Sequence, residues 1–287
     1  MTLLTSIARR IRPLVDRHPR AAMTYRHYRD LRDLTREPVA TPFGFRLVGN
    51  RDMESGEFEA AETMFVRRVL RQADVLVNVG ANIGYYCCFG LQLGKRVVAF
   101  EPLTANLRYL YRNVTANDWA DAIEVHPVAL GARPGLVEMY GSGTAASLVA
   151  GWAGIPLEYR QTVPLTTLDA SLGERFAGEQ LFIIVDIEGA ELGMLQGAAA
   201  VLAREPKPVW MVEISIDEHQ PNGARINAQL EATFAVFERA GYGVWQIGAT
   251  IERLAYSHVR RIASSGVNTL STHNFAFASA RHDFGRG

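Results

Sequence analysis

Apolar runs of five to seven residues alternate with helical segments from about residue 60 onward, and this alternation limits the fold more than any other feature of the chain. Strands are predicted over residues 75–79, 96–100, 123–128, 181–185 and 209–215. Helices between successive strands form βαβ units, whose strands run parallel in one sheet. The sequence therefore predicts an α/β fold with a mostly parallel, doubly wound sheet and helices on both faces.

The remaining predicted elements complete this pattern. Helices are expected over residues 62–72, 85–93, 104–117, 190–204 and 227–240, and further strands over residues 244–247 and 274–278. These last two strands are expected to form an antiparallel hairpin at one edge, which gives a seven-stranded sheet. The Gly-, Ser- and Ala-rich stretch 131–164 is predicted to be an elaborated loop or short hairpin that roofs an acceptor pocket, because such loops often carry binding contacts.

The N-terminal part has a different composition. Residues 1–60 are predicted to be a basic, mainly helical extension, and residues 61–287 the catalytic domain. Up to Pro38, nine arginines stand against four acidic residues, and apolar residues recur at near-helical spacing beside the arginines. Such a helix would suit an anionic membrane surface. The alternative is a solvated helix that packs on the domain or on a second copy of the chain in a homo-oligomer.

Bulk composition excludes several classes of protein. Thirty lysines and arginines balance thirty aspartates and glutamates, so no global field indicates nucleic acid or a polyanionic substrate. Cys87 and Cys88 are adjacent, which argues against an ordinary disulfide between them. The first arginines follow the apolar N-terminal residues, the reverse of a signal peptide, and no run is long enough to span a bilayer. The chain is therefore predicted to be cytoplasmic, at the inner face of the membrane if the basic segment binds lipid.

A turn of small residues follows the first predicted strand, in Asn78-Val-Gly80-Ala-Asn82-Ile-Gly84. Gly80 and Gly84 let the backbone bend sharply and approach a ligand, and the helix that follows begins with free amide donors. Dinucleotide-binding enzymes also use such turns. The turn alone therefore predicts a ligand site without identifying the ligand.

The second strand ends in Phe100-Glu101-Pro102, about one βα unit after the turn. A carboxylate at this position can accept hydrogen bonds from both ribose hydroxyls of an adenosine cofactor. Pro102 fixes the exit of the strand so that Glu101 points into the crevice. Together the turn and Glu101 predict an adenosyl pocket.

Acidic residues follow the next two strands. Asp186, Glu188 and Glu191 come directly after residues 181–185, and Glu213 lies in the strand at 209–215. Ligands of open α/β sheets bind outside the carboxyl ends of the strands, so these acids are expected near the reactive end of the cofactor. Glu188 and Glu191 have an alternative role as helix-start acids that the helix dipole favours.

Two chemical roles are open for these acids. Asp186, Glu213, His219 and His126 are the candidates for a general base, although either histidine would also fit a surface or core position. Alternatively, Asp186, Glu188 and Glu213 hold Mg²⁺, which prefers oxygen ligands. Acids around one crevice would repel one another without a cation, which slightly favours the metal.

These motifs together resemble those of the FkbM-type methyltransferases. The segments that match, in the order of the family and over roughly residues 62–278, are Asn78-Val-Gly-Ala-Asn82-Ile-Gly84-Tyr-Tyr86, Phe100-Glu101-Pro102 with Asn106 and Asn113, Val128-Ala-Leu-Gly131, Thr167-Leu-Asp169, Val185-Asp186-Ile-Glu188-Gly-Ala-Glu191, Leu195-Gln-Gly197-Ala198 and Asn274-Phe275. The resemblance implies a Rossmann-like class I methyltransferase fold with S-adenosylmethionine as cofactor. It also implies O-methylation of a sugar, a glycolipid or polysaccharide, or a polyketide-type natural product.

The resemblance also implies the roles of individual residues. The methionine end of the cofactor would lie at Asn78, Gly80, Asn82 and Gly84, the ribose at Glu101, and the adenine at residues 128–130, which include Val128 and Ala129. Asn78 departs from the family, where aspartate is expected. An amide keeps the hydrogen bonding but loses the charge that favours the cofactor's ammonium group.

Two other functions fit part of this pattern. A nicotinamide-dependent oxidoreductase would also use the glycine turn and Glu101, but Asn82 replaces the glycine that lets a pyrophosphate approach. A catalytically silent cofactor-binding subunit would keep the fold without turnover, and only Asn78 supports it.

Overall fold

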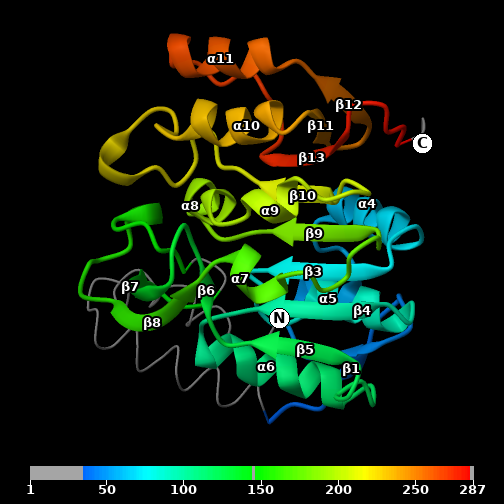
Figure 1. Ribbon diagram of the computed structural model, residues 1–287. Helices are drawn as coiled ribbons and strands as arrows, with labels where there is room; N and C mark the ends of the chain where they lie inside the picture. The colour runs from blue at the N-terminus through cyan, green and yellow to red at the C-terminus, as the bar shows by residue number, and fades with distance from the viewer. Residues whose placement is uncertain (1–34, 144–145, 285–287) are drawn as a thin grey trace.

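The computed structural model describes residues 35–143 and 146–284 (Figure 1). Its central sheet has eight strands in the order β12-β11-β13-β10-β9-β3-β4-β5. Strands β5, β4, β3, β9 and β10 are parallel, whereas β13 is antiparallel to both of its neighbours. The strands are β3 (Val75–Val79), β4 (Arg96–Phe100), β5 (Ile123–His126), β9 (Leu181–Val185), β10 (Val209–Glu213), β11 (Tyr242–Ile247), β12 (Ile251–Leu254) and β13 (Asn274–Ser279).

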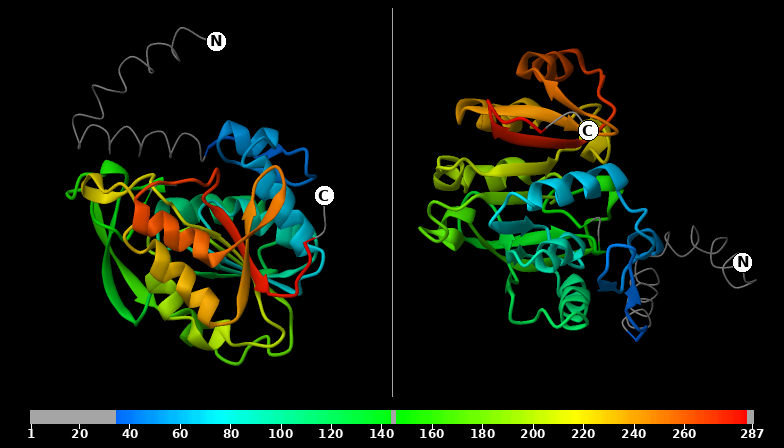
Figure 2. Two further views of the ribbon diagram at one scale, coloured as in Figure 1. Left: turned by 90° about the horizontal axis from the view of Figure 1, so that it is seen from above. Right: turned by 90° about the vertical axis from the view of Figure 1, so that its right-hand side faces the viewer.

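Helices cover both faces of this sheet, and each face has its own apolar core. Side chains alternate along β9, so that Phe182 and Ile184 pack with one set of helices and Leu181 and Ile183 with the other. The two sets lie on opposite sides of the sheet (Figure 2). The first set is α4 (Ala60–Leu70), α5 (Tyr85–Gln92) and α6 (Thr104–Thr115); the second is α7 (Leu168–Leu172), α8 (Glu191–Gln196), α9 (Ala199–Leu202), α10 (Leu230–Arg239) and α11 (Tyr256–Ser265).

The predicted fold class is confirmed, but the predicted number of strands is wrong. Strand β12 could not be predicted from the sequence, because its two central residues, Glu252 and Arg253, are charged and exposed. Strand β13 inserts between β10 and β11, so the hairpin at the sheet edge is formed by β11 and β12. The helix predicted over residues 190–204 is divided into α8 and α9. A side chain at Gly197, between them, would meet the carbonyl oxygen of Gly131 at 2.1 Å.

The stretch 131–164 contains the predicted hairpin. Strand β7 (Gly135–Tyr140) pairs antiparallel with β8 (Arg160–Thr166), which pairs parallel with the short β6 (Ala129–Leu130). This small sheet lies beside the carboxyl ends of the central parallel strands (Figure 1). We call the hairpin and its connection, which includes the 3-10 turn η2 (Trp152–Gly154), the roof.

The described residues before α4 also pack on the domain. Strands β1 (Val39–Ala40) and β2 (Arg46–Leu47) pair, α3 (Arg51–Ser55) follows, and Phe45 and Met53 join the core beneath α4 and α5. The predicted membrane helix lies outside the described residues, so it stays a prediction, as does the domain boundary near residue 60. No helix of the described part is long and apolar enough to cross a membrane.

Candidate functional site

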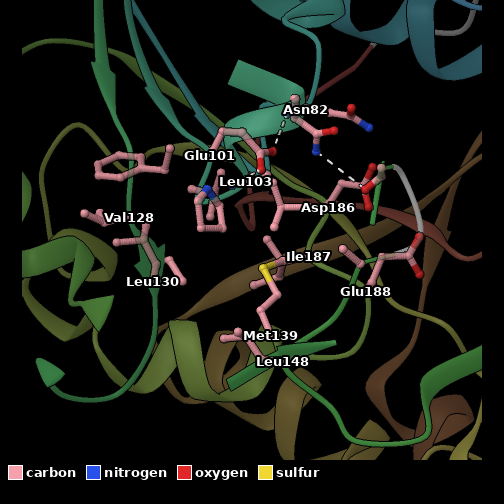
Figure 3. Close-up of a pocket in the computed structure, with 18 residues that line it drawn as sticks. Asn82, Glu101, Leu103, Val128, Leu130, Met139, Leu148, Asp186, Ile187 and Glu188 are labelled. Carbon is pink, nitrogen blue, oxygen red and sulfur yellow. Dashed lines mark hydrogen bonds between the residues drawn. The ribbon is translucent and has the colours of Figure 1, made fainter. Parts of the chain in front are cut away.

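A pocket opens at the carboxyl ends of the parallel strands (Figure 3). Five chain segments supply its lining: the turn after β3, the residues that follow β4, β5 and β9, and the roof. The roof contributes Met139 and Leu148, among other residues. Val128 and Glu188 lie at opposite ends of the pocket as drawn (Figure 3), so its apolar end and its acidic end are well separated.

Glu101 is a carboxylate in the pocket lining, and it lies between the apolar and the acidic end as drawn (Figure 3). It is 3 % exposed, and its two oxygens accept hydrogen bonds from the backbone N–H groups of Asn82 and Leu103, each at 2.8 Å. Burial raises the pKa of Glu101 to about 6, although these bonds and one from the Asn106 side chain oppose the shift. A carboxylate offers about four acceptor positions, and these bonds use three of them, so Glu101 can accept one further hydrogen bond from a ligand, or two if the ligand displaces the Asn106 side chain.

The glycines of the turn are explained by packing of the chain. Gly80 has φ +80°, and a Cβ there would lie 1.9 Å from the carbonyl oxygen of Asp186. Gly84 has φ +83° and precedes α5, and its Cβ would press on Leu110 at 3.1 Å. Gly80 lines the pocket, whereas Gly84 does not. Gly84 therefore shapes the turn from outside the pocket.

Asn82 presents an unused acceptor at the same place. Its backbone is left-handed, with φ 50°, and its N–H is bound to Glu101. Its side-chain oxygen Oδ1 is buried, with no hydrogen-bond partner among the described residues. A buried acceptor without a partner is costly, so a ligand that brings an N–H or O–H donor would satisfy it.

Asn78 lies deeper, within β3. It is 2 % exposed, and its Nδ2 donates to Sγ of Cys87 on α5 at 3.4 Å. Asn78 is not among the residues that line the pocket. Burial raises the pKa of Cys87 to about 12, so the thiol stays protonated beside the amide.

Three carboxyl groups meet at the acidic end of the pocket. Oxygens of Asp186, Glu188 and Glu213 all lie within 4.8 Å of one another, and we call these three residues the acid cluster. Asp186 and Glu188 line the pocket, and Glu213 lies behind them at the end of β10. The sequence predicted this same set as metal ligands, and the structure brings the three together.

Burial and mutual repulsion raise the pKa values of two residues of the acid cluster. Burial, followed by the charges of Asp186 and Glu188, raises the pKa of Glu213 to about 10. Burial and the charge of Glu188 also raise the pKa of Asp186 well above its usual range. The shift favours a proton on Glu213, and an ionised Asp186 is a stronger base than an exposed carboxylate.

A fourth acid, Glu59, adds to this repulsion and was not predicted from the sequence. Glu59 precedes α4 with a left-handed backbone, φ 43°, and accepts a 2.7 Å hydrogen bond from the Tyr86 hydroxyl. Its charge contributes to the raised pKa values of Asp186 and Glu213. Acidic residues are common at helix starts, so the sequence alone does not indicate that Glu59 lies near the acid cluster.

The remaining candidate residues lie outside the pocket lining. His219 is exposed, with its ring 6.1 Å from that of Trp152. His126 stacks on Phe100 at 4.7 Å, and its Nε2 pairs with Glu124 at 2.6 Å. Glu191, at the start of α8, accepts a hydrogen bond from the N–H of Gly189 at 2.8 Å. This contact fits the alternative role of Glu191 as an acid at a helix start.

Comparison with known proteins gives one family match. Residues 78–244, more than half of the chain, match the model described as the methyltransferase FkbM domain. No curated protein sequence matches. Among solved structures, the chain is similar to a ribosomal protein L11 methylase from Lactobacillus delbrueckii subsp. bulgaricus, with TM-score 0.42, 10 % identity and 80 % of each chain covered. It is also similar to a SAM-dependent O-methyltransferase from Thermotoga maritima, with TM-score 0.41, 10 % identity, and 84 % of this chain and 75 % of that chain covered.

Proposed function

Because the chain belongs to the FkbM methyltransferase family, we propose that it transfers a methyl group from S-adenosylmethionine to a hydroxyl of a sugar, a glycolipid or polysaccharide, or a polyketide-type natural product. One observation carries the proposal. A single pocket holds the buried Glu101 carboxylate at its middle and the paired acids Asp186 and Glu188 at one end. The first suits an adenosine ribose, and the second suits a hydroxyl that must lose a proton.

The residues of the pocket fit the cofactor. Glu101 can accept hydrogen bonds from both ribose hydroxyls when one of them takes the place of the Asn106 side chain, and the unpartnered Oδ1 of Asn82 suits the ammonium group of the methionine part. Apolar side chains of residues 128–130 form the side of the pocket that suits adenine. When bound, the cofactor supplies an already activated methyl group.

The protein then has to place the acceptor and remove its proton. Asp186 belongs to the acid cluster, lines the pocket and has a raised pKa, so we assign it the role of general base. Met139 and Leu148 of the roof exclude water from the acceptor oxygen. In this scheme Asp186 takes the hydroxyl proton, and Glu188 orients the acceptor beside it.

Removal of divalent metal tests the alternative use of the acid cluster. In the scheme above Asp186 takes the hydroxyl proton itself, and no step needs a cation. We therefore expect the methyl-transfer rate to be unchanged after treatment with EDTA and gel filtration. A rate that is lost with EDTA and restored by Mg²⁺, but not by Na⁺, would instead identify Asp186, Glu188 and Glu213 as its ligands.

We also propose that the protein works at the inner face of the membrane, supported by the arginine excess of residues 1–36. Deleting these residues should reduce co-sedimentation with anionic phosphatidylglycerol vesicles and leave cofactor affinity unchanged. Neutral phosphatidylcholine vesicles are the control, since they lack the charge that attracts arginine. Equal sedimentation of the deleted and full-length chains with anionic vesicles would contradict the proposal.

A labelled-methyl screen tests the function itself. Purified protein and S-adenosylmethionine labelled in the methyl group are incubated with small-molecule, glycolipid and polysaccharide fractions of the producing cell. We expect label in one fraction, and mass spectrometry of that product should place the methyl group on an oxygen. Label on nitrogen or carbon would contradict O-methylation but leave the family's methyl transfer intact.

A further inference from the structure

Trp152 of the roof packs against the backbone that follows the acid cluster. The residue is 2 % exposed, and its ring lies so close to Gly189 that a Cβ there would be 2.5 Å from the nearest ring atom. Any other residue at position 189 would displace the indole. The roof therefore rests on the turn that carries Glu188.

The roof also holds Glu188 by hydrogen bonds. The indole Nε1–H of Trp152 donates to Oε2 of Glu188 at 2.7 Å, and the Ser147 hydroxyl donates to the carbonyl oxygen of Glu188. Ser147 in turn accepts the N–H of Val149 at 2.9 Å. Among the residues that the structure describes, Trp152 is the only hydrogen-bond donor to the Glu188 carboxylate.

The backbone on both sides of this contact is unusual. Glu188 has φ 54° and Ala153 has φ 50°. This left-handed backbone conformation is higher in energy for a residue with a Cβ than for glycine. The N–H of Ala153 donates to the carbonyl oxygen of His219 at 2.9 Å, which joins the loop after β10 to the same place. The contacts of Trp152 and its neighbours thus hold these conformations.

We propose that Trp152 is a positioning residue, which fixes the Glu188 carboxylate at the acceptor end of the pocket and so joins the roof to the acid cluster. The inference rests on the proposed function, because it is the methyl acceptor that Glu188 would orient. With Oε2 held by the indole, the other carboxylate oxygen is left to accept a hydrogen bond from the acceptor. A ring that served packing alone would need no N–H at this position.

The hydrogen bond can be tested without the acceptor. The chain has four tryptophans, so ¹⁵N labelling of tryptophan gives four indole N–H signals by NMR. Trp152→Phe assigns one signal by its loss. Glu188→Gln should shift that signal and leave the other three in place. A Trp152 signal that does not move in Glu188→Gln would overturn the proposal, whatever the enzyme's activity.

A double-mutant cycle then tests the positioning role. With the extract fraction that accepts label, Trp152→Phe and Glu188→Gln should each lower kcat by about 10- to 100-fold, the loss expected for one charge-assisted hydrogen bond. The double variant should be no slower than the slower single variant, and the affinity for S-adenosylmethionine should not change. Losses that multiply in the double variant would show that the two residues act separately and overturn the proposal.

Trp210→Phe is the matched control. Trp210 is fully buried in β10 and donates its indole N–H to the Tyr242 hydroxyl at 3.4 Å, within the core. This substitution should lower Tm and leave kcat unchanged, whereas Trp152→Phe should lower kcat more than its change in Tm explains. If the wild-type protein labels no acceptor, the proposed function fails, and the NMR result still decides whether Trp152 holds Glu188.

Discussion

Replacing Asp186 with asparagine should lower the rate of methyl transfer by about 10²- to 10⁴-fold, the usual contribution of a positioned general base. Asparagine has nearly the same shape but cannot take a proton from the acceptor hydroxyl. Affinity for S-adenosylmethionine should stay within about twofold of wild type, because Glu101 and Asn82 make the cofactor contacts in our account. Single-turnover transfer of labelled methyl, with the cofactor saturating, measures the change.

The stability of this variant gives a second check. The pKa of Asp186 is raised in the folded protein, so ionising it at neutral pH opposes folding. A neutral side chain removes that cost, and Asp186→Asn should have a Tm at least equal to that of the wild type. Asp121→Asn, at an exposed position outside the pocket, is the matched control and should change neither rate nor Tm. An Asp186→Asn enzyme with the wild-type rate would exclude Asp186 as the base.

The second large effect is expected at Glu101. Glu101→Gln should weaken binding of S-adenosylmethionine and S-adenosylhomocysteine by about 10- to 100-fold for each ribose hydrogen bond that it loses. Glu124→Gln is the control, since Glu124 on β5 pairs with Arg175 at the surface and does not line the pocket. Calorimetric titration measures both variants. If Glu101→Gln is folded and binds both ligands like the wild type, Glu101 is not in the cofactor site.

The pH dependence of binding gives Glu101 a separate signature. Ribose hydroxyls donate to the ionised carboxylate, and the pKa of Glu101 in the free protein is about 6. Cofactor affinity should therefore be constant above this pKa and fall as the pH drops below it, by about tenfold per pH unit at most. Glu101→Gln should show no such fall. A wild-type affinity that rises at acid pH would contradict the assigned role.

The sequence predicted the parts of the fold whose patterns are strong. Strand β9 was predicted with its observed bounds, because a five-residue apolar run buried on both faces leaves little ambiguity. Strand β12 was missed because its central residues are charged. The segment before α4 was missed for another reason: β1 and β2 are only two residues long, β1 is exposed, and Phe45 and Leu47 are buried only by packing on parts of the chain that are distant in sequence.

The candidate site was predicted where it follows strand ends. Asp186, Glu188 and Glu213 come after or within adjacent parallel strands, so sheet geometry alone brings them together. Glu59 and Trp152 come from segments with no periodic pattern, and only the packing of the roof and of α4 places them beside the acids. From the sequence, the glycines of the turn were expected to let a ligand approach the backbone. In the structure, position 80 requires glycine because a Cβ there would clash with the carbonyl oxygen of Asp186.

Calorimetric titration of the full-length protein with S-adenosylmethionine and, separately, with NAD⁺ tests the central claim most directly. Both ligands carry an adenosine ribose, but only the first matches a pocket with Asn82 at its turn and acids where the reactive end would lie. The account predicts saturable binding of one S-adenosylmethionine per chain and no measurable binding of NAD⁺. Saturable binding of NAD⁺ without binding of S-adenosylmethionine would contradict it.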